Sequence, residues 1–124
     1  MMSDISVNDK RVLKLLFDCL NTLRRVDPEI SAKSAQLLIM IASNPELQSE
    51  HFRKRLKIAQ SSCSRNLAYL SPVSRHESEG LNLIVSYHAN KDRRRKSYQL
   101  TPKGQTLIRD LLIVLNCSLD LKDT

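Results

Sequence analysis

The feature that most constrains the fold is the segment of residues 91–104, which reads KDRRRKSYQLTPKG. Three consecutive arginines follow an aspartate in a stretch typical of a turn, and residues 97–100 then alternate between polar and apolar side chains, as a half-buried strand does. Thr101, Pro102 and Gly104 are residues that open a helix. The segment therefore predicts a β-hairpin with a basic tip that leads directly into a helix.

The first part of the chain predicts two helices separated by clear breaks. The first covers residues 5–26, where leucines and valines recur at helical spacing, and Asp27 and Pro28 end it. Ser31 or Ser34 can cap the second, whose LLIMIA core is apolar almost all round. Such a helix is expected to be buried at the centre of the fold.

Residues 49–70 predict a helix-turn-helix. A first helix is followed by a short turn over residues 57–60, and Ser61 or Ser62 can cap a second helix that ends before Pro72. Cys63 is expected to be a small buried residue of that second helix.

Residues 81–87 predict the partner strand of the hairpin, with Leu83, Val85 and Tyr87 on one face and Ile84 on the other. The hairpin, or wing, then covers residues 81–100, and a last helix covers 103–117. The length of 124 residues suits one domain over 1–124. The predicted fold class is mainly α with a small β-hairpin, a winged helix-turn-helix.

The basic charge of the chain is concentrated in one segment. The formal net charge is +7, and residues 51–109 carry +10, against −1 before them and −2 after them. A basic segment between nearly neutral ends is the electrostatic footprint of a polyanionic partner, with a merely solvated surface as the alternative. The distribution favours nucleic acid.

Several other classes of protein are not expected. No apolar run is long enough to span a membrane, and the first residues lack the apolar stretch of a signal peptide, so a cytoplasmic protein is expected. The three cysteines and three histidines show no metal-ligand spacing, and no cofactor is expected. No nucleophile–base motif or glycine-rich phosphate loop stands out, so we expect no enzyme.

Two segments resemble MarR-type transcriptional regulators. AQSSCSRNLAYL is similar to the recognition helix of that family, and DRRRKSYQLTPKG is similar to its wing. In the wing, the family's Asp-x-Arg and Leu-Thr-x-x-Gly positions are held by Asp92, Arg94, Leu100, Thr101 and Gly104. The resemblance covers roughly residues 30–115, although the loop over 71–80 is longer than the family's usual link. It implies a dimeric winged-helix transcription factor, most often a repressor, with its first and last helices at the dimer interface.

The second helix of the helix-turn-helix is expected to read DNA bases. Short polar side chains let a helix approach the major groove closely, and longer ones then reach base edges. Arg65 could bind guanine in a bidentate manner, and Asn66 or Gln60 could pair with adenine. The predicted base-reading residues are Gln60, Ser61, Ser62, Ser64, Arg65 and Asn66. The alternative is an ordinary capped surface helix.

The wing and the preceding helix supply the predicted backbone contacts. Arg94 is the best candidate for a narrow minor groove, and the resemblance implies that Asp92 orients it. Arg93, Arg95 and Lys96 are expected on phosphates, as are four residues of the first helix of the motif and its turn, namely Arg53, Lys54, Arg55 and Lys57. Some of these side chains are ordinary solvated charges in the alternative interpretation.

The predicted partners are double-stranded DNA and a second copy of the chain, acting on a pseudo-palindromic operator, with a small-molecule effector left open. Two alternatives remain at this point. One is a winged-helix module of a DNA replication or plasmid-maintenance protein, and the other is a protein-interaction module whose arginines only aid solubility.

Overall fold

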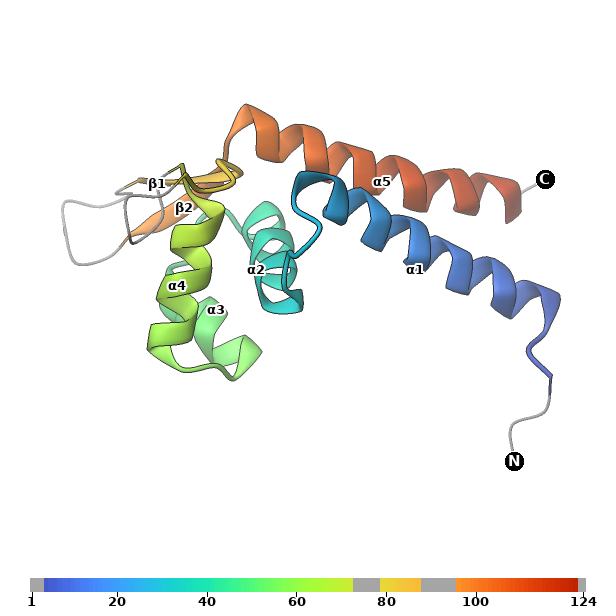
Figure 1. The fold of residues 1–124 in the computed structure, drawn as a ribbon, viewed down its shortest axis with the longest axis horizontal. Coiled ribbons are helices and arrows are strands. Elements are labelled where there is room, and N and C mark those ends of the chain that lie inside the picture. Colours follow the sequence, from blue (N-terminus) through green and yellow to red (C-terminus); the bar gives the residue numbers. More distant parts are fainter. Residues whose placement is uncertain (1–3, 73–78, 88–95, 123–124) are drawn as a thin grey trace.

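The computed structural model describes residues 4–72, 79–87 and 96–122, with side chains as far as residue 116. These residues form five helices and one antiparallel hairpin (Figure 1). The elements in chain order are α1 (Val7–Val26), α2 (Ala32–Ser43), α3 (Ser49–Leu56), α4 (Gln60–Leu70), β1 (Ile84–Tyr87), β2 (Ser97–Leu100) and α5 (Pro102–Lys122).

The molecule has two parts (Figure 1). Helices α2, α3 and α4 gather with the hairpin at one end, whereas α1 and α5 extend side by side away from them. The two long helices run in opposite directions, so both ends of the chain lie far from the hairpin. The helix-turn-helix and the wing are thus held at one pole of the molecule.

Helix α1 begins and ends where its sequence dictates. Ser6 accepts a hydrogen bond from the Asp9 backbone N–H while the Asp9 carboxylate accepts one from the Ser6 N–H, which is a reciprocal capping box. Asp27, in an extended conformation, terminates the helix as predicted. Only Thr22 and Leu23 of this helix are buried, so the protein's own core supports α1 near its C-terminal end alone.

Helix α2 lies at the centre of the core. Leu37, Leu38 and Ile41 are wholly buried against Phe52 of α3 and Leu70 of α4. Ser31 caps the helix by accepting from the Ser34 N–H, which decides between the two predicted caps. The prediction of a central buried helix is confirmed for this face.

The start of α4 differs from the prediction. The helix begins at Gln60 with Ala59 as its N-cap, and no side chain caps it, whereas Ser61 or Ser62 was expected in that role. The turn is one residue shorter than predicted: Lys57, in a left-handed conformation with φ of 55°, closes α3 after Leu56 as expected, and Gln60 already belongs to α4. Both serines therefore lie in the first turn of the helix.

The first strand of the hairpin is shorter than predicted, and Leu83 departs from the predicted alternation of faces. β1 starts at Ile84, which is buried, while Val85 is exposed. Asn82 adopts a left-handed conformation with φ of 56°, so that Leu83 and Ile84 both point into the core. Strict alternation over 81–87 was therefore the wrong assumption for this segment.

The hairpin itself is antiparallel, with Ile84 paired to Leu100 and Tyr87 to Ser97. The basic segment 88–95 thus connects the outer ends of the two strands. Helix α5 starts at Pro102, as the Thr-Pro pair predicts, and runs to Lys122, five residues beyond the expected end. Within the described residues, no helix combines the length and apolarity that crossing a bilayer requires.

Candidate nucleic-acid interface

Helix α4 presents a polar edge to solvent. Gln60, Ser61, Ser64 and Arg65 are exposed, whereas the opposite face, with Cys63, Leu67 and Leu70, is buried against the core. This separation agrees with the helical spacing predicted from sequence. Four of the six proposed base-reading side chains are therefore free to meet a ligand, and Ser62 is half-buried.

Asn66 departs from this arrangement. Its Oδ1 atom accepts a hydrogen bond of 2.6 Å from the Ser34 hydroxyl, and its Nδ2 atom donates to the Ser62 carbonyl oxygen at 2.7 Å. The amide is thereby used inside the protein, between α4 and the start of α2. We therefore leave Asn66 out of the base-reading set that we propose below.

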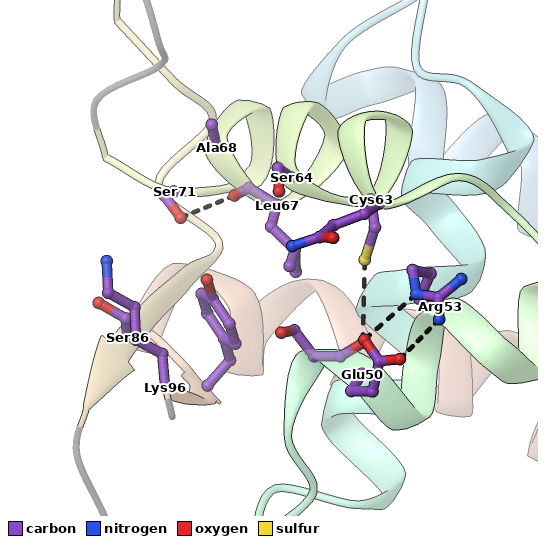
Figure 2. A pocket seen from close by; sticks show the side chains of 12 residues that line it. Glu50, Arg53, Cys63, Ser64, Leu67, Ala68, Ser71, Ser86 and Lys96 are labelled. Atoms are coloured by element: carbon purple, nitrogen blue, oxygen red, sulfur yellow. Dashed lines mark hydrogen bonds and ion pairs between the residues drawn. The ribbon is translucent and has the colours of Figure 1, made fainter. Parts of the chain in front are cut away.

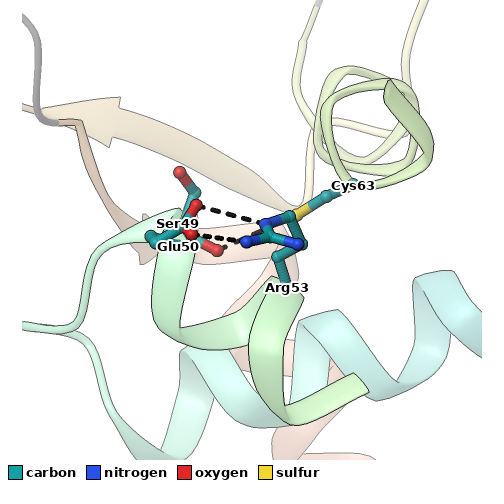
Figure 3. Close-up of polar contacts among 4 residues, drawn as sticks. All are labelled: Ser49, Glu50, Arg53 and Cys63. Atoms are coloured by element: carbon teal, nitrogen blue, oxygen red, sulfur yellow. Dashed lines mark hydrogen bonds and ion pairs between the residues drawn. The ribbon is translucent and has the colours of Figure 1, made fainter. Parts of the chain in front are cut away.

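Helix α3 places basic side chains beside α4. Lys54, Arg55 and Lys57 are exposed, but Arg53 forms an ion pair with Glu50 at 2.6 Å (Figure 3). The hydrogen bond from Arg53 lowers the pKa of the Glu50 carboxyl, and the same bond raises the pKa of the Arg53 guanidinium. Arg53 is thus partly neutralised, and the three exposed cations Lys54, Arg55 and Lys57 are better placed for phosphates.

A groove of about 470 Å³ separates α4 from the hairpin (Figure 2). Gln60 and Ser64 of α4 line one side, and Ser86 and Lys96 of the hairpin line the other. The Cys63 thiol, which also lines this groove, contacts the Ser49 carbonyl oxygen. Burial raises the pKa of the Cys63 thiol. Cys63 is therefore a buried packing residue, as expected, rather than a reactive thiol.

The tip of the wing falls outside the described residues. Asp92, Arg93, Arg94 and Arg95 all belong to it, and their roles stay predictions. Lys96 is described, is exposed and directly precedes β2, on the hairpin side of the groove. Lys96 thus lines the same groove as Gln60 and Ser64 of α4, as the winged-helix interpretation requires.

The Leu-Thr-x-x-Gly sequence has a structural role that sequence reasoning missed. The Thr101 hydroxyl donates to the Asn82 carbonyl oxygen at 2.7 Å and accepts from the Gly104 N–H at 3.0 Å. A Cβ atom on Gly104 would lie only 2.0 Å from the Leu83 carbonyl oxygen. Thr101 caps α5, and Gly104 lets that helix approach the root of the wing closely.

An apolar stripe runs along the exposed side of the two long helices. In α1 it comprises Val12, Leu13, Leu16, Phe17 and Leu20, and in α5 it comprises Leu112, Ile113 and Leu115. Phe17 is 62% exposed and Leu16 is 57% exposed. Large apolar side chains that recur at helical spacing along an exposed face are typical of an interaction surface.

The described residues contain no group of three or more acidic, histidine or cysteine side chains that could hold a metal ion. Their polar side chains at the α4 groove are hydroxyls, an amide and cations, together with the Glu50 carboxylate, which is paired with Arg53.

The fold is similar to that of several solved structures, although the sequence itself finds no match. The sequence matches no family model, and no curated protein matches it significantly. Among solved structures, an S. aureus MepR mutant bound to an oligodeoxyribonucleotide is 18% identical, with a TM-score of 0.70 over 95% of this chain and 82% of that one. The S. aureus MepR–DNA complex is 18% identical, with a TM-score of 0.69 over 95% and 90%.

NadR in complex with 4-hydroxyphenylacetate is 16% identical, with a TM-score of 0.64 over 99% of this chain and 83% of that one. At these identities the likeness shows the fold, which is the winged helix-turn-helix of the MarR-type structures. The fold class predicted from the two sequence segments is confirmed.

Proposed function

We propose that the protein is a sequence-specific double-stranded DNA-binding transcriptional regulator, a repressor that acts as a homodimer on a pseudo-palindromic operator. The observation that carries this proposal is the exposed polar edge of α4, flanked by exposed cations of α3 and by the root of the basic wing. A helix of this kind inserts its polar edge into the major groove, while cations beside it bind the phosphates.

The base-reading set consists of Gln60, Ser61, Ser62, Ser64 and Arg65. The serines allow close approach of the helix, and Arg65 is the longest donor on the exposed edge. Lys54, Arg55 and Lys57 of the α3 side, with Lys96 and the arginines of the wing, bind the backbone. Arg94 enters the flanking minor groove, oriented by Asp92.

The apolar stripe of α1 and α5 supports the homodimer. Packing two copies of the stripe against each other removes it from water and sets two α4 helices on one side of the dimer. Half-sites about one helical turn apart would match that two-fold arrangement. MepR is solved with DNA and NadR with 4-hydroxyphenylacetate, which makes a DNA operator and a small-molecule effector reasonable candidates for this chain too.

Selection from a pool of random duplex DNA at two salt concentrations tests the proposal. Enrichment of an inverted repeat that persists at the higher salt is expected. Binding that vanishes with salt and enriches no sequence would leave only a backbone clamp, as in the replication-module alternative. Absence of binding at both salts would favour the protein-interaction alternative.

Replacing Arg65 by alanine is expected to weaken operator binding by roughly 1–3 kcal/mol and to relax the base preference at one position of each half-site. The matched control is Arg55→Ala, which removes an exposed guanidinium from α3. It is expected to weaken all duplexes equally and to reduce the salt slope by about one. Equal losses on operator and random DNA for Arg65→Ala would rule out base reading by this residue.

A further inference from the structure

The connection between α1 and α2 lies against the recognition helix. Asp27 ends α1, and Ser31 caps α2. Their hydrogen-bond partners on α4 are Tyr69 and Asn66, which stand three residues apart and therefore on the same side of that helix. This side borders the exposed edge that carries Ser61 and Arg65, because Arg65 and Tyr69 are four residues apart on the helix.

The first contact is between Tyr69 and Asp27. The Tyr69 hydroxyl donates to Asp27 Oδ2, and the backbone N–H of Glu29 donates to Oδ1 at 2.9 Å, so both carboxylate oxygens are engaged. The bond from Tyr69, followed by that from Glu29, lowers the pKa of Asp27, whereas burial and then the bond to Asp27 raise the pKa of Tyr69. At neutral pH the donor stays protonated and the acceptor stays charged, which is the strong form of such a bond.

The second contact joins Ser34 to Asn66 at 2.6 Å, with the Ser31 hydroxyl 3.3 Å from the same amide oxygen. Ser34 is 1% exposed, so the bond is shielded from water. Ser31 is also the N-cap of α2 and is hydrogen-bonded to Ser34. The same group of side chains therefore caps α2 and fixes the rotation of α4 about its own axis.

These contacts add to the packing of α5 on α2 and β2, which also joins the two parts of the molecule. Helix α1 packs mainly on α5, whereas α4 packs on α2 and α3. The apolar stripe that would form the dimer seam lies on α1 and α5, and the base-reading edge lies on α4. The angle between the dimer seam and the reading edge therefore depends in part on the Tyr69–Asp27 bond, which joins the end of α1 to α4, and on the Ser34–Asn66 bond, which holds α4 to the start of α2.

We propose that Tyr69, Asp27, Ser34 and Asn66 are positioning residues that fix α4 relative to the dimer helix α1 and so select the spacing between operator half-sites. The inference rests on the proposed function. Loss of these bonds lets each α4 settle over a wider range of angles, and neighbouring spacings then become acceptable. The contacts of α4 with bases and phosphates remain those of the intact protein.

A set of duplexes that carry the selected half-sites at spacings one base pair shorter, unchanged and one base pair longer tests this inference. For the full chain carrying Tyr69→Phe and Ser34→Ala, the ratio of affinities between the best and the neighbouring spacings is expected to fall by roughly two- to tenfold for each of the two hydrogen bonds removed. The salt slope, which counts phosphate contacts, should not change.

The matched control is Tyr87→Phe, which removes an exposed hydroxyl that donates to the Pro45 carbonyl oxygen at 2.9 Å and does not join α1 to α4. It should keep the spacing preference of the unaltered protein. A thermal melt of each variant shows that the comparison is made between folded proteins.

An unchanged ratio in the double variant, beside a sharp preference in the unaltered protein, would overturn the positioning role and leave the proposed function intact. If the unaltered protein shows no spacing preference at all, the dimeric regulator fails and the positioning role fails with it.

Discussion

A protein with glutamate in place of both Leu16 and Phe17 is expected to be monomeric and to bind a two-half-site operator roughly 10²–10⁴-fold more weakly. Both side chains are more than half exposed on the apolar stripe of α1. In the proposed dimer they are buried against a second copy, where an unpaired carboxylate is strongly unfavourable. Without the dimer, the two recognition helices no longer act at high effective concentration.

Light scattering coupled to size-exclusion chromatography measures the mass, and a binding titration with a single half-site measures the affinity that remains. The matched control is Ile39→Glu, which places the same charge at an exposed apolar residue of α2, away from the stripe. That variant should remain dimeric. A double variant that is still a dimer would show that the stripe of α1 is not the seam.

Replacing Gly104 by alanine is expected to destabilise the protein by about 1–3 kcal/mol, the usual range for overpacking. The sign of this change in the free energy of unfolding is informative, because within a helix glycine is ordinarily about 0.5–1 kcal/mol less favourable than alanine. Without a steric clash, the substitution would stabilise the protein. Here the added Cβ atom would lie 2.0 Å from the Leu83 carbonyl oxygen and 3.3 Å from the Leu100 side chain. Either α5 or the root of the wing must move to make room.

Urea denaturation of the two proteins gives the free energy of unfolding directly. Gln105→Ala is the matched control, since residue 105 is exposed and occupies the next position of the same helix. Its effect should stay within about 0.5 kcal/mol. If Gly104→Ala is as stable as the control, the close approach of α5 to the segment before β1 does not contribute to stability.

The helices and their breaks could be predicted because each depends on neighbours in sequence. Asp27 and Pro28 end α1, Ser31 caps α2, and the Thr-Pro pair at 101 and 102 opens α5. The exposed edge of α4 was also predictable, since helical spacing alone separates Ser61, Ser64 and Arg65 from the buried face. The basic charge of the wing region follows from composition.

The faces of β1 and the role of Asn66 could not be predicted in this way. Alternation assigns Leu83 and Ile84 to opposite faces, but both side chains are buried, because Leu83 precedes the strand and follows the left-handed residue Asn82. The amide side chain of Asn66 is of the type that reads adenine, but its oxygen accepts a hydrogen bond from Ser34, 32 residues earlier in the chain. Gly104 belongs to a recognisable pattern, although the atom that demands a glycine there belongs to Leu83.

The sequence by itself determined which segments become helices, where α1 and α2 begin or end, which edge of α4 is polar and where the positive charge is concentrated. Each of these properties arises from spacing and side-chain chemistry over a few residues. Tertiary structure alone decided that Asn66 and Tyr69 bind the α1–α2 connection, that α5 contacts the root of the wing, and that the stripe on α1 stays exposed. Those outcomes depend on how distant helices pack, because the hydrogen-bond partners and the uncovered surfaces exist only once the segments have come together.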